Sequence, residues 1–237
     1  KFPFNVPNSE TVIDLAFGEM RPEREQLSGA NKNFYSVNNG VTISGISQSV
    51  LLTTVDAPLL EIGGMTGEEW QKDQKNFLEW KRSASSSSTI YSWVMNNSWR
   101  TNYKASQEGR VSFKYSIIPL KPYSHESKIR SQEVAQPLMG VVSGSARAYE
   151  PLFWLGGRNK ISVSTIRPSK DKSGYIVRLV NLSNQPVQSA IEWGSIKPES
   201  VYVSDNREQQ IEKLTGETVW MKPYGTLTLK MNLKSAQ

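Results

Sequence analysis

Apolar and polar residues alternate along several short runs of this chain, and this alternation constrains its fold more than any other feature. Residues 226–233 (TLTLKMNL) place an apolar side chain at every second position. Residues 111–117 repeat the pattern, and their apolar positions are Val111, Phe113, Tyr115 and Ile117. A period of two is typical of a strand that is buried on one face only. We therefore predict a half-buried antiparallel strand for each run.

Short β-rich runs account for most of the remaining pattern. Further strand candidates are residues 41–46, 49–55, 161–166, 175–181, 187–193, 201–204 and 217–221. Gly, Pro, Asn and Ser separate these runs, as expected for turns. The pattern indicates an all-β fold: an antiparallel β-sandwich followed by a small C-terminal β-sandwich.

Helical signals are few. Residues 124–136 (SHESKIRSQEVAQ) predict one short helix, with Ser124 as a cap and Pro137 as the stop. The charge-rich residues 67–82 fit either a helical or an irregular excursion from the sheets.

The length of 237 residues suits one large domain or two modest ones. A strand-poor stretch ends near Tyr149, and closely spaced strands resume after Gly156-Gly157. We predict one β-rich domain over residues 1–150 and a small separate sandwich over residues 157–237.

Composition excludes several classes of function. The chain has no Cys, which removes disulfides, thiolate metal sites and cysteine nucleophiles. Its net charge is +6, but the cations are scattered among 22 acidic residues, so we expect no nucleic-acid partner. No apolar run approaches the roughly 20 residues that span a bilayer, so we expect no membrane partner. We expect a soluble protein, periplasmic or cytoplasmic, and the sequence does not decide the compartment.

Candidate catalytic residues are scarce. The single histidine, His125, has no cluster of metal-ligating neighbours and no nucleophile motif to activate. Asp56 and Glu61 bracket a Pro turn and form the one carboxylate pair that glycoside hydrolysis, which needs two carboxylates about 5–10 Å apart, could use. A solvated loop explains that pair better. We assign no catalytic residue and no metal ligand.

The richest local feature is residues 93–103 (WVMNNSWRTNY). Indole, amide and hydroxyl groups together suit a sugar-contacting surface, and the candidate residues are Asn96, Asn97, Trp99, Thr101 and Asn102. The alternative is a structural loop whose amides satisfy buried backbone groups. From the physics of these side chains alone, the structural loop is favoured.

Four ordered motifs resemble glycoside hydrolase family 38, the bacterial α-mannosidases. The first is Asn96-Asn97-x-Trp99-x-Thr101-Asn102-Tyr103, followed by Gly109 and the run Val111–Ile117. The others are Arg21-Pro22-Glu23 with Gln26-Leu27-Ser28-Gly29, the stretch Leu52–Gly64 (LTTVDAPLLEIGG), and Ile176-Val177-Arg178-Leu179-Val180-Asn181. Because they span most of the chain in order, chance agreement is a poor explanation.

The resemblance implies that the chain comprises the C-terminal β-domains of such an enzyme, the first being part of a galactose-mutarotase-like supersandwich. In the family, a preceding catalytic domain supplies the Asp nucleophile, the acid/base group and a divalent metal, zinc, for retaining hydrolysis of α-mannosides. No residue here matches those motifs, so we expect no cofactor in this chain. The implied partners are the catalytic domain of the same polypeptide and α-mannosides.

Three hypotheses about function follow. The first is a non-catalytic region that braces the catalytic domain and lends the loop 95–103 to the rim of the sugar site. The second is an autonomous carbohydrate-binding module, which would need Trp70, Trp80 or Trp99 in an exposed row. The third is a hydrolase that uses Asp56 and Glu61.

Overall fold

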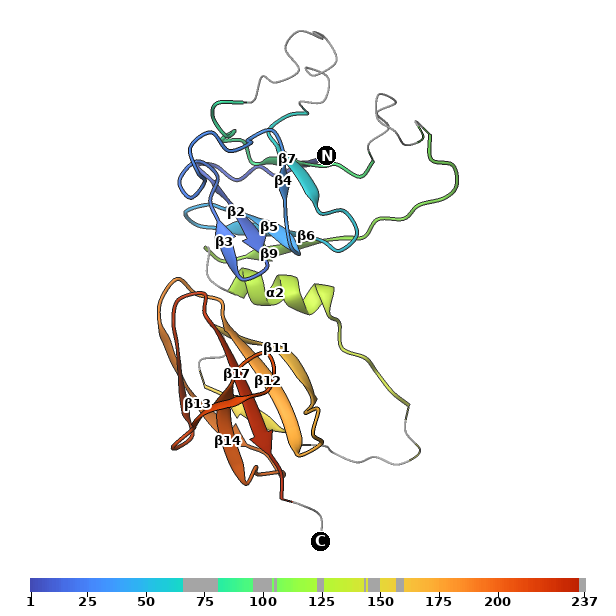
Figure 1. The fold of residues 1–237 in the computed structure, drawn as a ribbon. Coiled ribbons are helices and arrows are strands. Elements are labelled where there is room, and N and C mark those ends of the chain that lie inside the picture. The colour runs from blue at the N-terminus through green and yellow to red at the C-terminus, as the bar shows by residue number, and fades with distance from the viewer. Residues whose placement is uncertain are drawn as a thin grey trace. The chain divides into compact units, whose positions relative to one another are not determined.

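The computed structural model describes residues 1–65, 81–95, 104, 106–122, 126–142, 144, 150–156 and 160–234. The chain divides into two compact units, unit 1 (Lys1–Leu138) and unit 2 (Met139–Gln237), which are described separately below (Figure 1). Antiparallel sheets build both units, which confirms the all-β fold class. No helix in the described part of the chain is long and apolar enough to cross a membrane.

Two antiparallel sheets form unit 1. The larger has the order β3-β2-β5-β6-β9, and the smaller has the order β1-β8-β7-β4. The strands of the larger sheet are β2 (Glu10–Leu15), β3 (Gly18–Met20), β5 (Gly40–Ser44), β6 (Ser49–Thr54) and β9 (Tyr115–Leu120). Those of the smaller sheet are β1 (Phe2–Pro3), β4 (Tyr35–Ser36), β7 (Leu59–Ile62) and β8 (Thr89–Ser92).

The core of unit 1 lies between these two sheets. Val41 and Ile43 of β5 are buried in it, and the intervening Thr42 faces the other side of the larger sheet. Leu60 and Ile62 of β7 contribute from the smaller sheet in the same alternating way. The sheets therefore pack face to face as a sandwich.

Helix α2 (Glu126–Ala135) covers the second face of the larger sheet, where it packs on β6. The position of this helix agrees with the prediction for residues 124–136, although Ser124 and His125 lie outside the described residues. Its buried side chains are Ser127, Lys128 and Ser131, all of which are polar. The helix is consequently held by polar contacts and not by an apolar stripe.

The strand predicted at residues 111–117 is displaced in the structure. Residues 111–114 are not in a strand, and β9 begins only at Tyr115 and continues to Leu120. Ile117, predicted to be half-buried, is 53% exposed, and Ile118 is the more buried of the two. The prediction was wrong because the sheet pairs β9 with β6 from Tyr115 opposite Thr54 onward, and this pairing, not the local pattern, sets the strand.

Unit 2 is a second sandwich. One sheet has the order β11-β12-β17-β14-β15 and the other the order β10-β13-β16. The strands of the first are β11 (Ile161–Pro168), β12 (Gly174–Asn181), β14 (Ser200–Ser204), β15 (Gln210–Lys213) and β17 (Thr226–Asn232). Those of the second are β10 (Phe153–Leu155), β13 (Val187–Trp193) and β16 (Thr218–Met221).

Alternating residues of both sheets fill the core of unit 2. Leu229 and Met231 of β17 are buried, as the pattern of residues 226–233 predicts. Val177 and Leu179 of β12 pack with them. Ile191 of β13 closes the core from the three-stranded sheet. The domain boundary drawn from the sequence, between residues 150 and 157, stays a prediction.

Close backbone approach at Gly174 yields a test of this packing. A Cβ atom at position 174 would lie 1.8 Å from the carbonyl oxygen of Met231, on the neighbouring strand β17. We expect Gly174→Ala to lower the free energy of unfolding by about 1–3 kcal/mol, because β12 or β17 must shift. Urea denaturation measures the change. Gly140→Ala is the matched control, since a Cβ atom at position 140 would meet no atom within 4 Å; equal midpoints for the two variants would contradict the strand pairing.

Candidate functional site

The described residues on either side of the predicted sugar-contacting segment lie close together. Asn96, Asn97, Trp99, Thr101 and Asn102 themselves lie outside the described residues. At the ends of the loop, the hydroxyl of Ser92 on β8 lies 2.8 Å from the hydroxyl of Tyr115 on β9. The last residue of β8 and the first residue of β9 are therefore in direct contact.

Trp93 fixes the first residue of this loop. Its backbone N–H donates to the carbonyl of Leu59 (2.9 Å), and its indole N–H donates to the carbonyl of Met95 (2.7 Å). Its ring meets Phe34 edge to face, with centroids 5.2 Å apart. This aromatic pair gives the loop a rigid base.

Asp56 and Glu61 lie in different environments. The Asp56 carboxylate accepts a hydrogen bond from the backbone N–H of Lys114 (3.0 Å), at the returning end of the same loop. Glu61 is buried within β7, where it lies between the core residues Leu60 and Ile62 and faces away from the core. These positions favour structural use of both carboxylates over a catalytic pair.

A buried lysine holds helix α2 on the larger sheet of unit 1. Lys128 Nζ lies 2.6 Å from Asp14 Oδ1 and donates also to the carbonyls of Leu15 and Gly18, both at 2.6 Å. The side chain of Lys128 is 3% exposed and that of Asp14 is 8% exposed. All three ammonium protons have an acceptor, which is the condition for a buried charge to be tolerated.

The Asp14 carboxylate has further donors. Asp14 Oδ2 accepts from the backbone N–H of Asn39 (3.2 Å) and from the hydroxyl of Ser131 (3.3 Å). A cavity of about 10 Å³ lies beside the pair and is lined in part by Thr42 and Ser127. That volume admits about one water molecule, so this region cannot hold a sugar.

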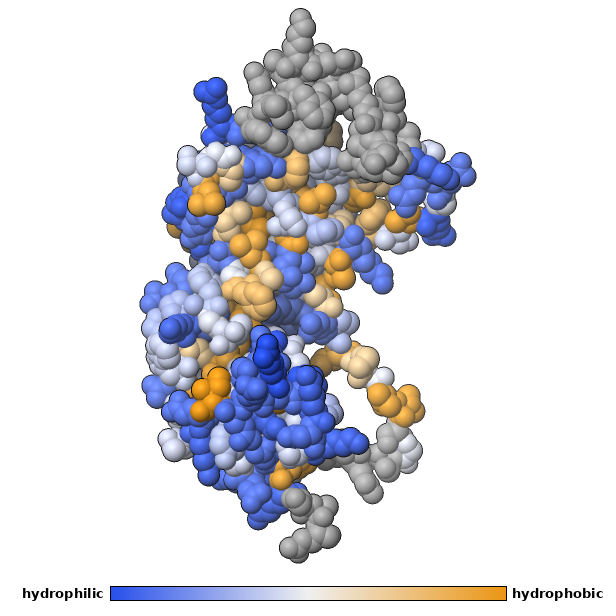
Figure 2. Space-filling model, viewed as in Figure 1, coloured by the Kyte–Doolittle hydropathy of each residue, from blue (hydrophilic) through white to orange (hydrophobic). Residues whose placement is uncertain are grey.

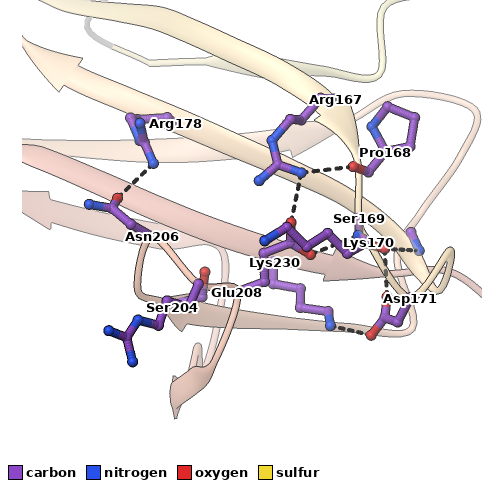
Figure 3. Close-up of polar contacts among 12 residues, drawn as sticks. Arg167, Pro168, Ser169, Lys170, Asp171, Arg178, Ser204, Asn206, Glu208 and Lys230 are labelled. Atoms are coloured by element: carbon purple, nitrogen blue, oxygen red, sulfur yellow. Dashed lines mark hydrogen bonds and ion pairs between the residues drawn. The ribbon is translucent and has the colours of Figure 1, made fainter.

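A charged clasp joins two hairpins of unit 2 (Figure 3). We give this name to Arg167, Lys170, Asp171, Glu208 and Lys230. Arg167 pairs with Glu208 at 2.7 Å, and the Glu208 carboxylate also accepts from the backbone N–H of Lys170 (2.8 Å). Lys230 pairs with Asp171. The β14–β15 loop is thereby tied to the β11–β12 loop.

Hydrogen bonds set the ionisation of the two clasp carboxylates. The ammonium of Lys230, together with the hydroxyls of Ser173 and Ser169, holds the pKa of Asp171 far below its usual range. The backbone N–H of Lys170 is the largest cause that lowers the pKa of Glu208, and Arg167 adds to it. Both groups are therefore ionised near neutral pH, as a structural clasp requires.

No metal centre can be assigned. Among the described residues, no group of three or more His, Cys, Asp or Glu gathers in a way that could hold a metal ion. His125 lies outside those residues.

The fold and these sites define a class, a two-sandwich β-protein with structural ion pairs. Comparison with known proteins shows what the chain is similar to. Residues 160–237 match the family described as the glycosyl hydrolases family 38 C-terminal beta sandwich domain. An α-mannosidase from Enterococcus faecalis V583 superimposes with a TM-score of 0.68 at 12% identity, over 98% of this chain and 25% of that chain. A family 38 glycosyl hydrolase from Enterococcus faecalis gives 0.66 at 9% identity, over 96% of this chain and 25% of that one.

The comparisons confirm the resemblance seen in the sequence. The last third of the chain matches the C-terminal β-sandwich domain of family 38, and the chain as a whole has a fold similar to that of a region of the α-mannosidase chain. It spans a quarter of the length of the solved chains that it matches. No curated protein sequence matches it.

Removal of the buried lysine tests the role of the Lys128–Asp14 pair. We expect Lys128→Met to lower the free energy of unfolding by about 3–5 kcal/mol, because Asp14 is left buried without a counter-charge. Adding Asp14→Asn should restore much of that loss, since the amide oxygen can still accept from Asn39. Urea denaturation measures both. A double variant no more stable than Lys128→Met would contradict the pairing.

Acidification should destabilise unit 2, because the clasp carboxylates become protonated. The pKa values of Asp171 and Glu208 are lower in the folded state than in the unfolded chain. Their contribution to stability is therefore present above the unfolded values of about 4 and is lost as pH falls toward the folded ones. Thermal unfolding monitored between neutral and acidic pH should show this loss. The double variant Asp171→Asn/Glu208→Gln should flatten the pH dependence, and an unchanged slope would contradict the clasp.

Proposed function

We propose that this chain is a non-catalytic β-sandwich region of an α-mannosidase-like glycoside hydrolase, and that it braces the catalytic domain of the same polypeptide. The observation that carries the proposal is the fold match over 98% of this chain to an α-mannosidase of which it covers only 25%. A region of that kind needs stable packing more than it needs reactive groups. The structural contacts of Asp56 and Lys128 support such a region.

The loop that leaves the sandwich at Trp93 is the part we propose to reach the sugar site. Its base is rigid because Trp93 packs on Phe34 and Ser92 meets Tyr115. A rigid base and a long loop of amide and aromatic residues suit a rim that contacts α-mannosides. Asn96, Asn97, Trp99, Thr101 and Asn102 are the proposed contacts.

Metal chemistry belongs, in this proposal, to the catalytic domain. The described residues of this chain offer no ligand cluster, so no catalytic step is assigned to them. The autonomous-module hypothesis depended on Trp70, Trp80 and Trp99, which lie outside the described residues, and no observation favours it over the brace.

The proposal is tested in the polypeptide that joins this chain to a catalytic domain. We expect Trp99→Ala to lower kcat/KM on an aryl α-mannoside about tenfold or more while the midpoint of thermal unfolding stays unchanged. Ile211→Ala, at an exposed position of unit 2, is the matched control and should leave kcat/KM unchanged.

The bracing role has its own readout. We expect Lys128→Met to lower the temperature at which mannosidase activity is lost, because unit 1 loosens beneath the catalytic domain. Activity that survives unfolding of unit 1, followed by tryptophan fluorescence, would overturn the bracing role.

A further inference from the structure

Two tryptophans lie on the outer face of the three-stranded sheet of unit 2. Trp154 of β10 stands opposite Glu192 of β13, and Trp220 of β16 stands opposite Gln188 of the same strand. β13 is the central strand. Its two neighbours thus carry one indole each, on either side of it.

Burial shows that this face points away from the core. Along β13, Val187, Ser189 and Ile191 are buried, whereas Gln188, Ala190 and Glu192 are exposed. Trp220 is 57% exposed although Val219 and Met221, on each side of it, are buried. Trp154 is half-buried between the core residues Phe153 and Leu155. Both indoles therefore belong to the outer surface.

Small residues form a low row between the two indoles. Ala190 pairs with Thr218 on one side, and on the other the N–H of Gly156 donates to the Ala190 carbonyl (2.9 Å). Glu192 with Trp154 borders this row at one end and Gln188 with Trp220 at the other. Four residues of strand separate the two borders, a distance of about 13 Å.

The side chains on this outer face of the three-stranded sheet indicate which class of ligand it would bind. Its six outward side chains within the strands comprise two indoles, one amide, one carboxylate, one hydroxyl and one methyl, and none is cationic; they are Trp154, Gln188, Ala190, Glu192, Thr218 and Trp220. A phosphate or another anion would meet Glu192 without a counter-charge. A flat apolar partner would bury Gln188 and Glu192 without hydrogen bonds. A neutral ligand with apolar CH faces and many hydroxyls satisfies all of these groups.

We propose that this face binds a neutral pyranose oligosaccharide. Trp154 and Trp220 would stack on sugar rings at the two borders, Glu192 would accept hydroxyl protons, and Gln188 would both donate and accept. The separation of the borders accommodates a chain of a few sugars across the low row. This site lies in unit 2, is distinct from the loop 95–103, and does not depend on the bracing role.

The test uses the 237-residue chain labelled with nitrogen-15. Indole N–H signals are followed during titration with linear α-mannotriose and, separately, with cellotriose, to millimolar concentration. We expect the signals of Trp154 and Trp220 to shift along one saturable curve with at least one of these probes. Trp154→Ala and Trp220→Ala should each weaken that binding about tenfold.

Control variants separate this face from the loop 95–103 and from nonspecific binding. Ile211→Ala removes an apolar side chain that is 69% exposed on β15 of the other sheet, and it should leave the affinity unchanged. Trp99→Ala should also leave it unchanged. If Trp99→Ala abolishes the shifts and Trp154→Ala/Trp220→Ala does not, the sugar binds the loop, and this proposal is overturned while the proposed function gains support.

Two further results would overturn the proposal. One is the absence of any saturable shift in either indole with both probes. The other is a fall in sedimentation coefficient on Trp154→Ala/Trp220→Ala in a chain that does not respond to sugar, since the face would then join two copies of the chain.

Discussion

A lysine with an almost completely buried ammonium fixes helix α2 to the sandwich of unit 1, and the second face of the larger sheet depends on it. Lys128 reaches Asp14 on β2 and the carbonyls of Leu15 and Gly18 around the β2–β3 turn. An apolar helix face could pack on the sheet in several registers. Three directed hydrogen bonds form in only one register. In the described part of the helix, Ser127 and Ser131 are the other buried side chains, so the apolar effect contributes little to its position.

Ion pairs also fix the structure of unit 2. Its core is apolar and alternating, and ion pairs tie its loops to its strands: Arg167 of β11 pairs with Glu208, and Lys230 of β17 pairs with Asp171. Apolar surface also remains outside the two cores. The extended segment after α2 carries Leu138, Met139, Val141 and Val142, all highly exposed, and orange atoms mark apolar residues along it (Figure 2). A region that packs beside further protein is consistent with such a surface.

Alternation predicted β13, which is buried on one face only, and β17, whose Leu229 and Met231 lie in the core. It failed where a different interaction sets the strand. β2 (ETVIDL) was missed because Val12, Ile13 and Asp14 are all buried, so both faces are covered and no alternation appears. β1 and β4 have two residues each, which is too few for any period, and they form only because they pair with neighbouring strands.

The sequence located α2, but a lysine on a helix ordinarily indicates a solvated face, so nothing local marked Lys128 as buried. The clasp joins residues that are 38 positions apart, as in Lys170 and Glu208, or 59 apart, as in Asp171 and Lys230, and only the pairing of the strands brings them together. The motif at Asn96–Asn102 was visible in the sequence, whereas the opposition of Trp154 and Trp220 requires the register of β13.

We propose that this chain braces a glycoside hydrolase and carries none of its catalytic groups. Hydrolysis of an aryl α-mannoside by the purified 237-residue chain, with and without added zinc, tests that claim most directly. The account predicts a rate indistinguishable from that of buffer under both conditions. Turnover that is proportional to protein concentration and is lost in Asp56→Asn or Glu61→Gln would contradict it.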